Sequence, residues 1–74
     1  MKPLRFGYEI RKVRERAKLT QRAFAAKLGI KNVYVCNLEH DVPPSLSVIE
    51  NIERVFGTNV YVEAWKARRK EMEP

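Results

Sequence analysis

The chain has 74 residues, a formal net charge of +6 and one cysteine, Cys36. This length predicts one small domain with a thin stability margin, and a lone cysteine excludes an intrachain disulfide. Residues 1–22 hold eight lysines and arginines against two glutamates, a balance that suits a polyanionic partner. The sequence lacks both the run of roughly 20 apolar residues that spans a membrane and the apolar core of a signal peptide. We therefore expect a cytoplasmic protein without a membrane partner.

The first predicted helix runs from about Pro3 to Ala17. Pro3 suits a first helical turn, where its missing N–H group costs nothing. Phe6, Ile10, Val13 and Ala17 recur at helical spacing and predict one apolar stripe. The opposite, charged face is expected to carry Arg5, Glu9, Arg11, Lys12, Arg16 and Lys18.

Residues 20–41, TQRAFAAKLGIKNVYVCNLEHD, predict two short helices joined by a tight turn. Thr20 is a good N-cap for a helix that ends at Leu28, and Gly29 readily adopts the left-handed conformation that closes a helix. This is the layout of a helix-turn-helix, whose second helix lies in the major groove of DNA.

The second helix of this pair is expected over about Asn32 to His40. Val35 and Leu38 are three residues apart and should point to the core. β-Branched and Asn residues give this helix a poor intrinsic propensity, so tertiary packing must hold it. The outward face is then expected to carry Asn32, Val33, Cys36 and Asn37.

Pro43 and Pro44 bar helix continuation after the third helix. A fourth helix follows, capped either by Ser45 or by Ser47, which has the spacing of a capping box with Glu50. Its expected buried residues are Leu46, Ile49, Ile52, Val55 and Phe56, with Gly57 at its end.

The tail, residues 58–74, has two interpretations. The run VYVEAW alternates somewhat like a strand, whereas the run KARRKEME is strongly helical in character. We favour a fifth helix over about residues 59–71, because two pairs have four-residue spacing. These pairs are Val60 with Ala64 and Tyr61 with Trp65.

Several motifs stand in a fixed order along residues 7–57. They comprise IRKVRERAKLTQ, then Gln21, then Ala25, Leu28, Gly29 and Ile30, then Val35, Leu38 and Glu39, and finally Pro44, Ser45, Leu46 and Gly57. This order resembles the Cro/repressor-type helix-turn-helix family, also called the xenobiotic-response-element (XRE) family. The resemblance implies an all-α, compact, five-helix lambda-repressor-like domain over residues 1–74. In it, residues 58–74 form a C-terminal helix or tail.

The resemblance also implies roles for particular residues. Helix two would anchor on DNA phosphates through its N-terminus and Gln21, and helix three would contact base edges or the adjacent backbone. Arg14 and Glu39 stand where relatives place a buried structural ion pair. The implied DNA-binding residues are Thr20, Gln21, Arg22, Lys31, Asn32, Val33, Tyr34 and Asn37.

The chemistry of helix three supports base contacts, with alternatives. Asn32 and Asn37 suit bidentate contacts to adenine, and Val33 suits a thymine methyl group, which indicates an A/T-containing half-site. The two asparagines lie about 140° apart around the helix, so both can face one groove only if they border the contact strip. Asn32 could instead cap the helix. Tyr34 could donate to a phosphate or pack between helices.

The sequence departs from the family pattern at three places. Asp41 replaces the Gly that usually follows the recognition helix, and Ala23 replaces a Glu that would complete a capping box with Thr20. Residues 42–44 contain no basic side chain that would contact phosphates.

Together these patterns predict a sequence-specific transcription regulator, acting as a repressor. It would bind a palindromic operator as a homodimer, with half-sites about 10 bp apart. Tyr61 and Trp65 would form the dimer interface, pack on the core, or do both. The alternatives are an antitoxin that also binds a toxin, a restriction–modification controller, or a protein–protein adaptor without specific DNA binding.

Catalysis and cofactors find no support in the sequence. No nucleophile–base set and no Gly-rich phosphate loop are present, so we expect no enzyme and no cofactor. Cys36 and His40 have a spacing that can bind a metal, but no third ligand accompanies them, and we expect no metal site.

Overall fold

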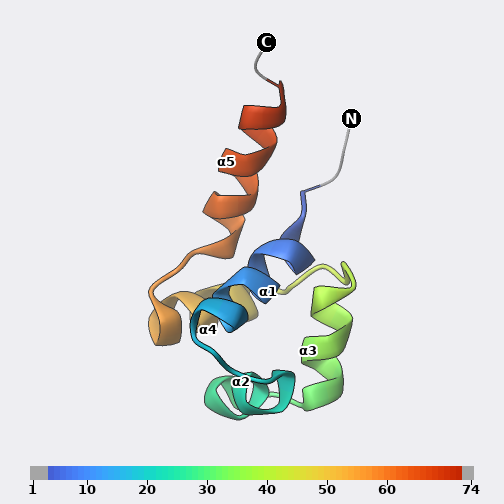
Figure 1. Ribbon diagram of the computed structural model, residues 1–74, viewed down its shortest axis with the longest axis vertical. Coiled ribbons are helices and arrows are strands. Elements are labelled where there is room, and N and C mark those ends of the chain that lie inside the picture. Colours follow the sequence, from blue (N-terminus) through green and yellow to red (C-terminus); the bar gives the residue numbers. More distant parts are fainter. Residues whose placement is uncertain (1–3, 73–74) are drawn as a thin grey trace.

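The computed structural model describes residues 4–72, and this part of the chain folds into five α-helices without a strand (Figure 1). The predicted all-α, five-helix fold is confirmed, and the tail is a helix rather than a strand. Pro3 lies outside the described residues, but Leu4 and Arg5 are not helical, so the first helix begins later than expected, at Phe6. No helix in the described range is long and apolar enough to cross a membrane. The helices are α1 (Phe6–Arg16), α2 (Gln21–Leu28), α3 (Asn32–Glu39), α4 (Leu46–Phe56) and α5 (Val60–Met72).

All five helices contribute to one hydrophobic core. Phe24 on α2 is fully buried and stacks on Phe56 of α4, with ring centroids 4.9 Å apart. Burying a side chain of this size stabilises the fold by about 1.5–3 kcal/mol. The buried cluster comprises Ile10, Val13, Phe24, Ala25, Leu28, Val35, Leu38, Val48, Ile49, Ile52 and Val60.

Helix α1 approaches the C-terminal end of α3 very closely at Gly7. A Cβ atom at this position would lie 2.8 Å from the backbone oxygen of Glu39 and 2.9 Å from that of Leu38. Such distances are too short for any side chain, so the crossing of α1 and α3 requires glycine at residue 7.

Helices α1, α2 and α3 end in the same kind of turn, with one residue in the left-handed conformation. These residues are Lys18 (φ 58°), Gly29 (φ 68°) and Asp41 (φ 68°). Asp41 therefore does adopt the conformation usual for the Gly it replaces, whereas Lys18 was not expected to do so. Each turn is closed by a Schellman hydrogen bond. The bonds join the N–H of Leu19 to Arg14 O (3.2 Å), of Ile30 to Ala25 O (3.0 Å) and of Val42 to Asn37 O (3.1 Å).

Helix α4 begins with Ser45 as its cap, since the Ser45 hydroxyl accepts a hydrogen bond from Val48 N at 3.3 Å. The predicted burial of Leu46 and Val55 is wrong: their exposed fractions are 70% and 40%. Leu46 is the first residue after the cap, at the open start of the helix. The residues that α4 does bury most deeply are Val48, Ile49 and Ile52.

The expectation that Glu9 lies on an exposed charged face is also wrong, because this side chain is only 3% exposed. Helix α5 packs against α1 and covers this part of it. The Glu9 carboxylate forms an ion pair with Lys12 Nζ at 2.9 Å, and the lysine compensates the buried negative charge. Ala17, expected in the apolar stripe, is exposed at the end of α1.

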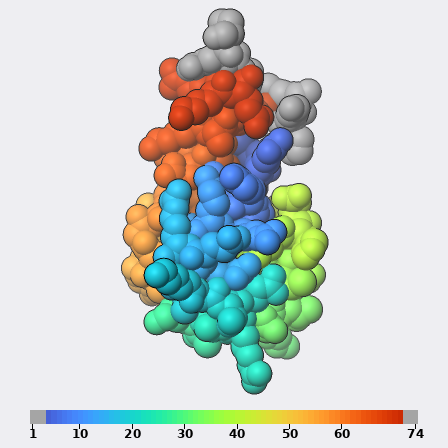
Figure 2. All heavy atoms as spheres, viewed as in Figure 1, coloured from blue at the N-terminus to red at the C-terminus, as the bar shows by residue number. Residues whose placement is uncertain are grey.

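Helix α5 is anchored by its first turns, where Val60 and Ala64 are buried. Asn59 caps it, with its side-chain oxygen accepting from Val62 N at 3.1 Å. Figure 2 shows α5 at one end of the molecule, above α1, while α2 and α3 form the opposite end. Thus the helix-turn-helix and the distal part of α5 are far apart.

Candidate nucleic-acid interface

Helix α3 buries two apolar side chains in the core and presents a mainly polar outer face that also includes Val33. Val35 and Leu38 are fully buried, as predicted. On the outer side Asn32 and Asn37 are exposed, and Val33 is 63% exposed. These three side chains are therefore accessible to the edges of bases.

The first turn of α3 shows whether Asn32 caps this helix. The N-cap residue is Lys31, whose side chain makes no capping bond, and Asn32 is the first residue of the helix. The suggestion that Asn32 caps α3 is thus wrong. Both the exposed Lys31 ammonium and the Asn32 amide are left for an external partner.

The N-terminus of α2 has the features of an anion-binding helix end. The Thr20 hydroxyl accepts from Ala23 N at 3.1 Å, which is half of a capping box, and its own hydrogen stays available to a phosphate. Arg22 is exposed and makes no ion pair with any described residue. Together with the positive end of the α2 dipole, these groups favour a phosphate.

Two further residues of α3 are partly buried. Tyr34 packs against the core, which matches the packing alternative considered for it and leaves part of the side chain accessible. Cys36 Sγ lies 3.8 Å from His40 Nδ1, and the same ring nitrogen lies 2.7 Å from Cys36 O. Within the described residues, no third His, Cys, Asp or Glu joins this pair to form a candidate metal site.

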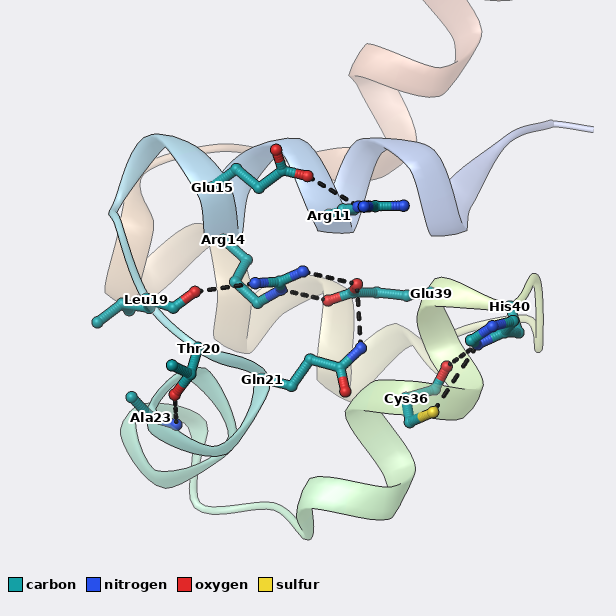
Figure 3. A network of polar contacts seen from close by, with 10 residues as sticks. All are labelled: Arg11, Arg14, Glu15, Leu19, Thr20, Gln21, Ala23, Cys36, Glu39 and His40. Atoms are coloured by element: carbon teal, nitrogen blue, oxygen red, sulfur yellow. Dashed lines mark hydrogen bonds and ion pairs between the residues drawn. The ribbon is translucent and has the colours of Figure 1, made fainter.

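Arg14 and Glu39 form an ion pair between α1 and α3 (Figure 3). Arg14 Nε donates to Glu39 Oε2 at 2.7 Å, and Arg14 Nη2 donates to Oε1 at 3.1 Å, so the contact is bidentate. A third guanidinium nitrogen donates to Leu19 O at 2.9 Å in the turn before α2. Side-chain exposure is only 15% for Arg14 and 5% for Glu39, which makes this pair structural.

The hydrogen bond and charge of Glu39 raise the pKa of Arg14 above its usual value, against the smaller opposing effect of partial burial. A raised pKa stabilises the fold below the unfolded-state pKa and loses this effect only as pH rises through the folded-state pKa. Since both values lie in the strongly alkaline range, the arginine charge contributes at every ordinary pH.

Gln21 joins the same network, which the sequence did not indicate. Its Nε2 donates to Glu39 Oε1 at 3.3 Å, so the first residue of α2 is tied to the last residue of α3 (Figure 3). One amide hydrogen is used, while the second hydrogen and the carbonyl oxygen remain available to a further partner. The network thereby fixes the angle between the two helices of the motif.

Asn51 on α4 makes a hydrogen bond to the helix-turn-helix that the sequence does not indicate. Its Nδ2 donates to the backbone oxygen of Leu28 at 2.7 Å, and so satisfies a carbonyl at the C-terminal end of α2. The turn at Gly29 is therefore stabilised by this side-chain bond as well as by the backbone bond from Ile30 N to Ala25 O.

Comparisons with known proteins agree with this geometry. A family model described as helix-turn-helix matches residues 10–61, from α1 into the first turn of α5. Neither the curated proteins nor the solved structures contain a significant match. The matched span holds α2, α3 and the Arg14–Glu39 network. The chain therefore belongs to the Cro/repressor-type helix-turn-helix family of DNA-binding, transcription-regulator-type domains.

Proposed function

We propose that this protein is a sequence-specific transcriptional repressor that binds a palindromic operator as a homodimer. Helix α3 enters the major groove, and the N-terminus of α2 contacts phosphates on its rim. The observation that carries this proposal is the outward face of α3. Asn32, Val33 and Asn37 are exposed there, on a helix whose orientation is fixed by the bonds of Glu39.

Specificity would come from few contacts. One bidentate Asn–adenine pair discriminates by about 1–3 kcal/mol, so a monomer distinguishes sites only weakly. Because residues 42–44 add no positive charge, Pro43 and Pro44 have no N–H group and the Val42 N–H already donates to Asn37 O, this loop offers no donor to a phosphate. These features favour a dimer, which doubles the number of base contacts.

The dimer interface is proposed to lie on α5. Tyr61, Val62 and Trp65 are each 43–45% exposed on the surface of α5. Tyr61 stacks on Phe6 at 6.0 Å between centroids, and Arg68 lies 5.3 Å from the Trp65 ring. The rings are thus both partly packed and accessible. Exposed aromatic groups of this kind anchor protein interfaces well.

The first experiment is selection of random DNA duplexes by the purified protein at about 0.15 M salt. Enrichment of a palindrome with half-sites about 10 bp apart supports the proposal. If no sequence is enriched and binding disappears as the salt concentration rises, the protein binds DNA only through non-specific attraction to phosphates, which contradicts the proposal.

Variants of the selected complex test the assignment of residues. Asn37→Ala should weaken specific binding by about 1–3 kcal/mol and relax the preference at one base pair. Lys31→Gln should weaken binding to all sequences and lower the salt dependence. Lys27→Gln is the matched control, because Lys27 is exposed on the last turn of α2 and also makes no ion pair with a described residue. Equal effects of the two lysine substitutions would refute the proposed orientation.

A second candidate is a protein–protein adaptor, or an antitoxin that uses DNA and a toxin in turn. It is favoured by the apolar groups at exposed positions, Val33 at 63% and Leu46 at 70%. Sedimentation of the protein alone and with operator DNA separates the candidates. A specific complex with two protein chains supports the homodimeric repressor, whereas a monomer that ignores every duplex supports the adaptor.

A further inference from the structure

A basic groove lies between α1 and α5, away from the helix-turn-helix. Four cations line a cavity of about 280 Å³: Lys12 and Arg16 from α1, and Lys66 and Lys70 from α5. Two carboxylates, Glu9 and Glu63, lie in the same wall. Four positive charges against two negative charges leave an excess of two positive charges.

The groove is on the opposite side of α1 from the Arg14–Glu39 network. Lys12 and Arg16 are each two residues from Arg14, so each lies about 200° around the helix from it. Arg14 points to Glu39 on α3 (Figure 3), whereas the groove lies between α1 and α5, which pack against each other. A duplex bound along α3 therefore does not reach these cations.

The groove meets the aromatic surface of α5 at Lys66, which also lines the hollow beside Tyr61 and Trp65, but its other cations lie apart from that surface. Lys70 lies about 140° around the helix from Trp65. The cavity that contains Lys70 is lined neither by Tyr61 nor by Trp65. Neither the proposed DNA contact nor the proposed dimer contact accounts for this concentration of charge.

The carboxylates do not neutralise the groove. Glu9 is buried and already pairs with Lys12 at 2.9 Å, while Glu63 pairs only loosely with Lys66 at 3.8 Å. Arg16 and Lys70 are exposed and make no ion pair with any described residue. Two cationic donors, one on each wall, thus have no anionic partner among residues 4–72.

The donor chemistry fits a multiply charged oxyanion such as phosphate. The Arg16 guanidinium presents a planar fork that matches two phosphate oxygens, whereas Lys66 and Lys70 supply point charges. Thr58, on the α4–α5 connection, also lines the cavity and adds a hydroxyl donor. We propose that this groove binds a small phosphate-bearing anion, such as a phosphate monoester or pyrophosphate, and that the ligand bridges α1 to α5.

The size of the site argues for a small ligand rather than a second duplex. The cations converge on a small concave space between two helices, whereas a duplex needs cations spread along an open surface. An excess of two positive charges matches the charge of one phosphate monoester dianion.

The test is an NMR titration of the full chain with inorganic pyrophosphate, at a constant ionic strength of about 0.15 M. Saturable amide shifts confined to residues 12–16 and 58–70 are expected. Arg16→Gln and Lys70→Gln should each raise the Kd about tenfold, the effect of losing one charged hydrogen bond. Lys27→Gln removes the same charge from α2 and should leave the Kd within about twofold of the original value.

Three results would overturn the proposal. They are shifts spread over α2 and α3, an equal loss of affinity in Lys27→Gln, and the absence of saturation. A parallel titration with a short DNA duplex distinguishes the two anion sources. If the duplex shifts the groove amides and pyrophosphate does not, the groove is a second DNA contact. Thermal melts of each variant without ligand establish that a lost response is not a loss of folding.

Discussion

Neutralising Glu39 should destabilise this protein far more than neutralising Glu15, whose ion pair with Arg11 is exposed. In Glu39→Gln the shape is kept, but the 85% buried side chain of Arg14 loses its counter-ion and Gln21 loses a charged acceptor. Breaking a buried pair costs about 3–5 kcal/mol, and we expect about 3 kcal/mol because Arg14 keeps its bond to Leu19 O. A 74-residue domain has only about 4–11 kcal/mol of stability in total, at roughly 0.05–0.15 kcal/mol per residue.

The assay is urea unfolding followed by circular dichroism, with a thermal melt beside it. A loss of about 3 kcal/mol lowers the Tm of a domain of this size by about 12–24 °C. Glu15→Gln is the matched control, because Glu15 pairs with Arg11 at 2.8 Å but both side chains are more than half exposed. This control should cost at most about 0.5 kcal/mol.

The single variants Arg14→Met and Glu39→Met, together with the double variant, form a thermodynamic cycle. Arg14→Met with Glu39→Met removes both charges together and should recover much of the loss, because no uncompensated charge is then buried. The reasoning is refuted if Glu39→Gln and Glu15→Gln have equal effects, or if the double variant is as unstable as the two single variants combined.

Three further predictions concern packing and turns. Gly7→Ala should destabilise by roughly 1–3 kcal/mol in urea unfolding, since the new Cβ would press on backbone oxygens of α3; a gain in stability would contradict the close crossing. Lys18→Gly should stabilise by about 0.5–1 kcal/mol by relieving a left-handed lysine, whereas Lys27→Gly inside α2 should cost about 1 kcal/mol. Val60→Ala should cost at least about 1.5 kcal/mol of stability, at roughly 0.8 kcal/mol for each methylene equivalent removed from the core. Val62→Ala, at a partly exposed position, is the control and should change the melting temperature little. Equal costs would show that α5 is not docked through Val60.

The helix-turn-helix could be predicted from the sequence because its signals are local. Thr20 as cap, Gly29 as helix end, and the buried pair Val35 and Leu38 each depend on residues within a few positions. The orientation of the exposed face of α3 follows from that pair alone.

The features that were missed depend on contacts between distant segments. The sequence could not indicate that Glu9 is buried, because the cover comes from α5, more than 50 residues further along. The bonds of Gln21 to Glu39 and of Asn51 to Leu28 likewise follow no periodicity. Gly7 did carry a signal, since a glycine inside a helix costs about 1 kcal/mol and indicates a packing reason.

The anchoring of α5 by Val60 and Ala64 has a consequence for local unfolding. Beyond these two buried residues, the helix leaves the core, and Lys66, Arg69 and Lys70 are exposed. Backbone amides near Phe24 should exchange with deuterium only when the whole chain unfolds, whereas those in the last turns of α5 should exchange through fraying that costs almost no free energy. The end of α5 therefore behaves as its own cooperative unit. A partner that covers the end of α5 would slow deuterium exchange of the amides at this end alone and leave the exchange of the core amides unchanged.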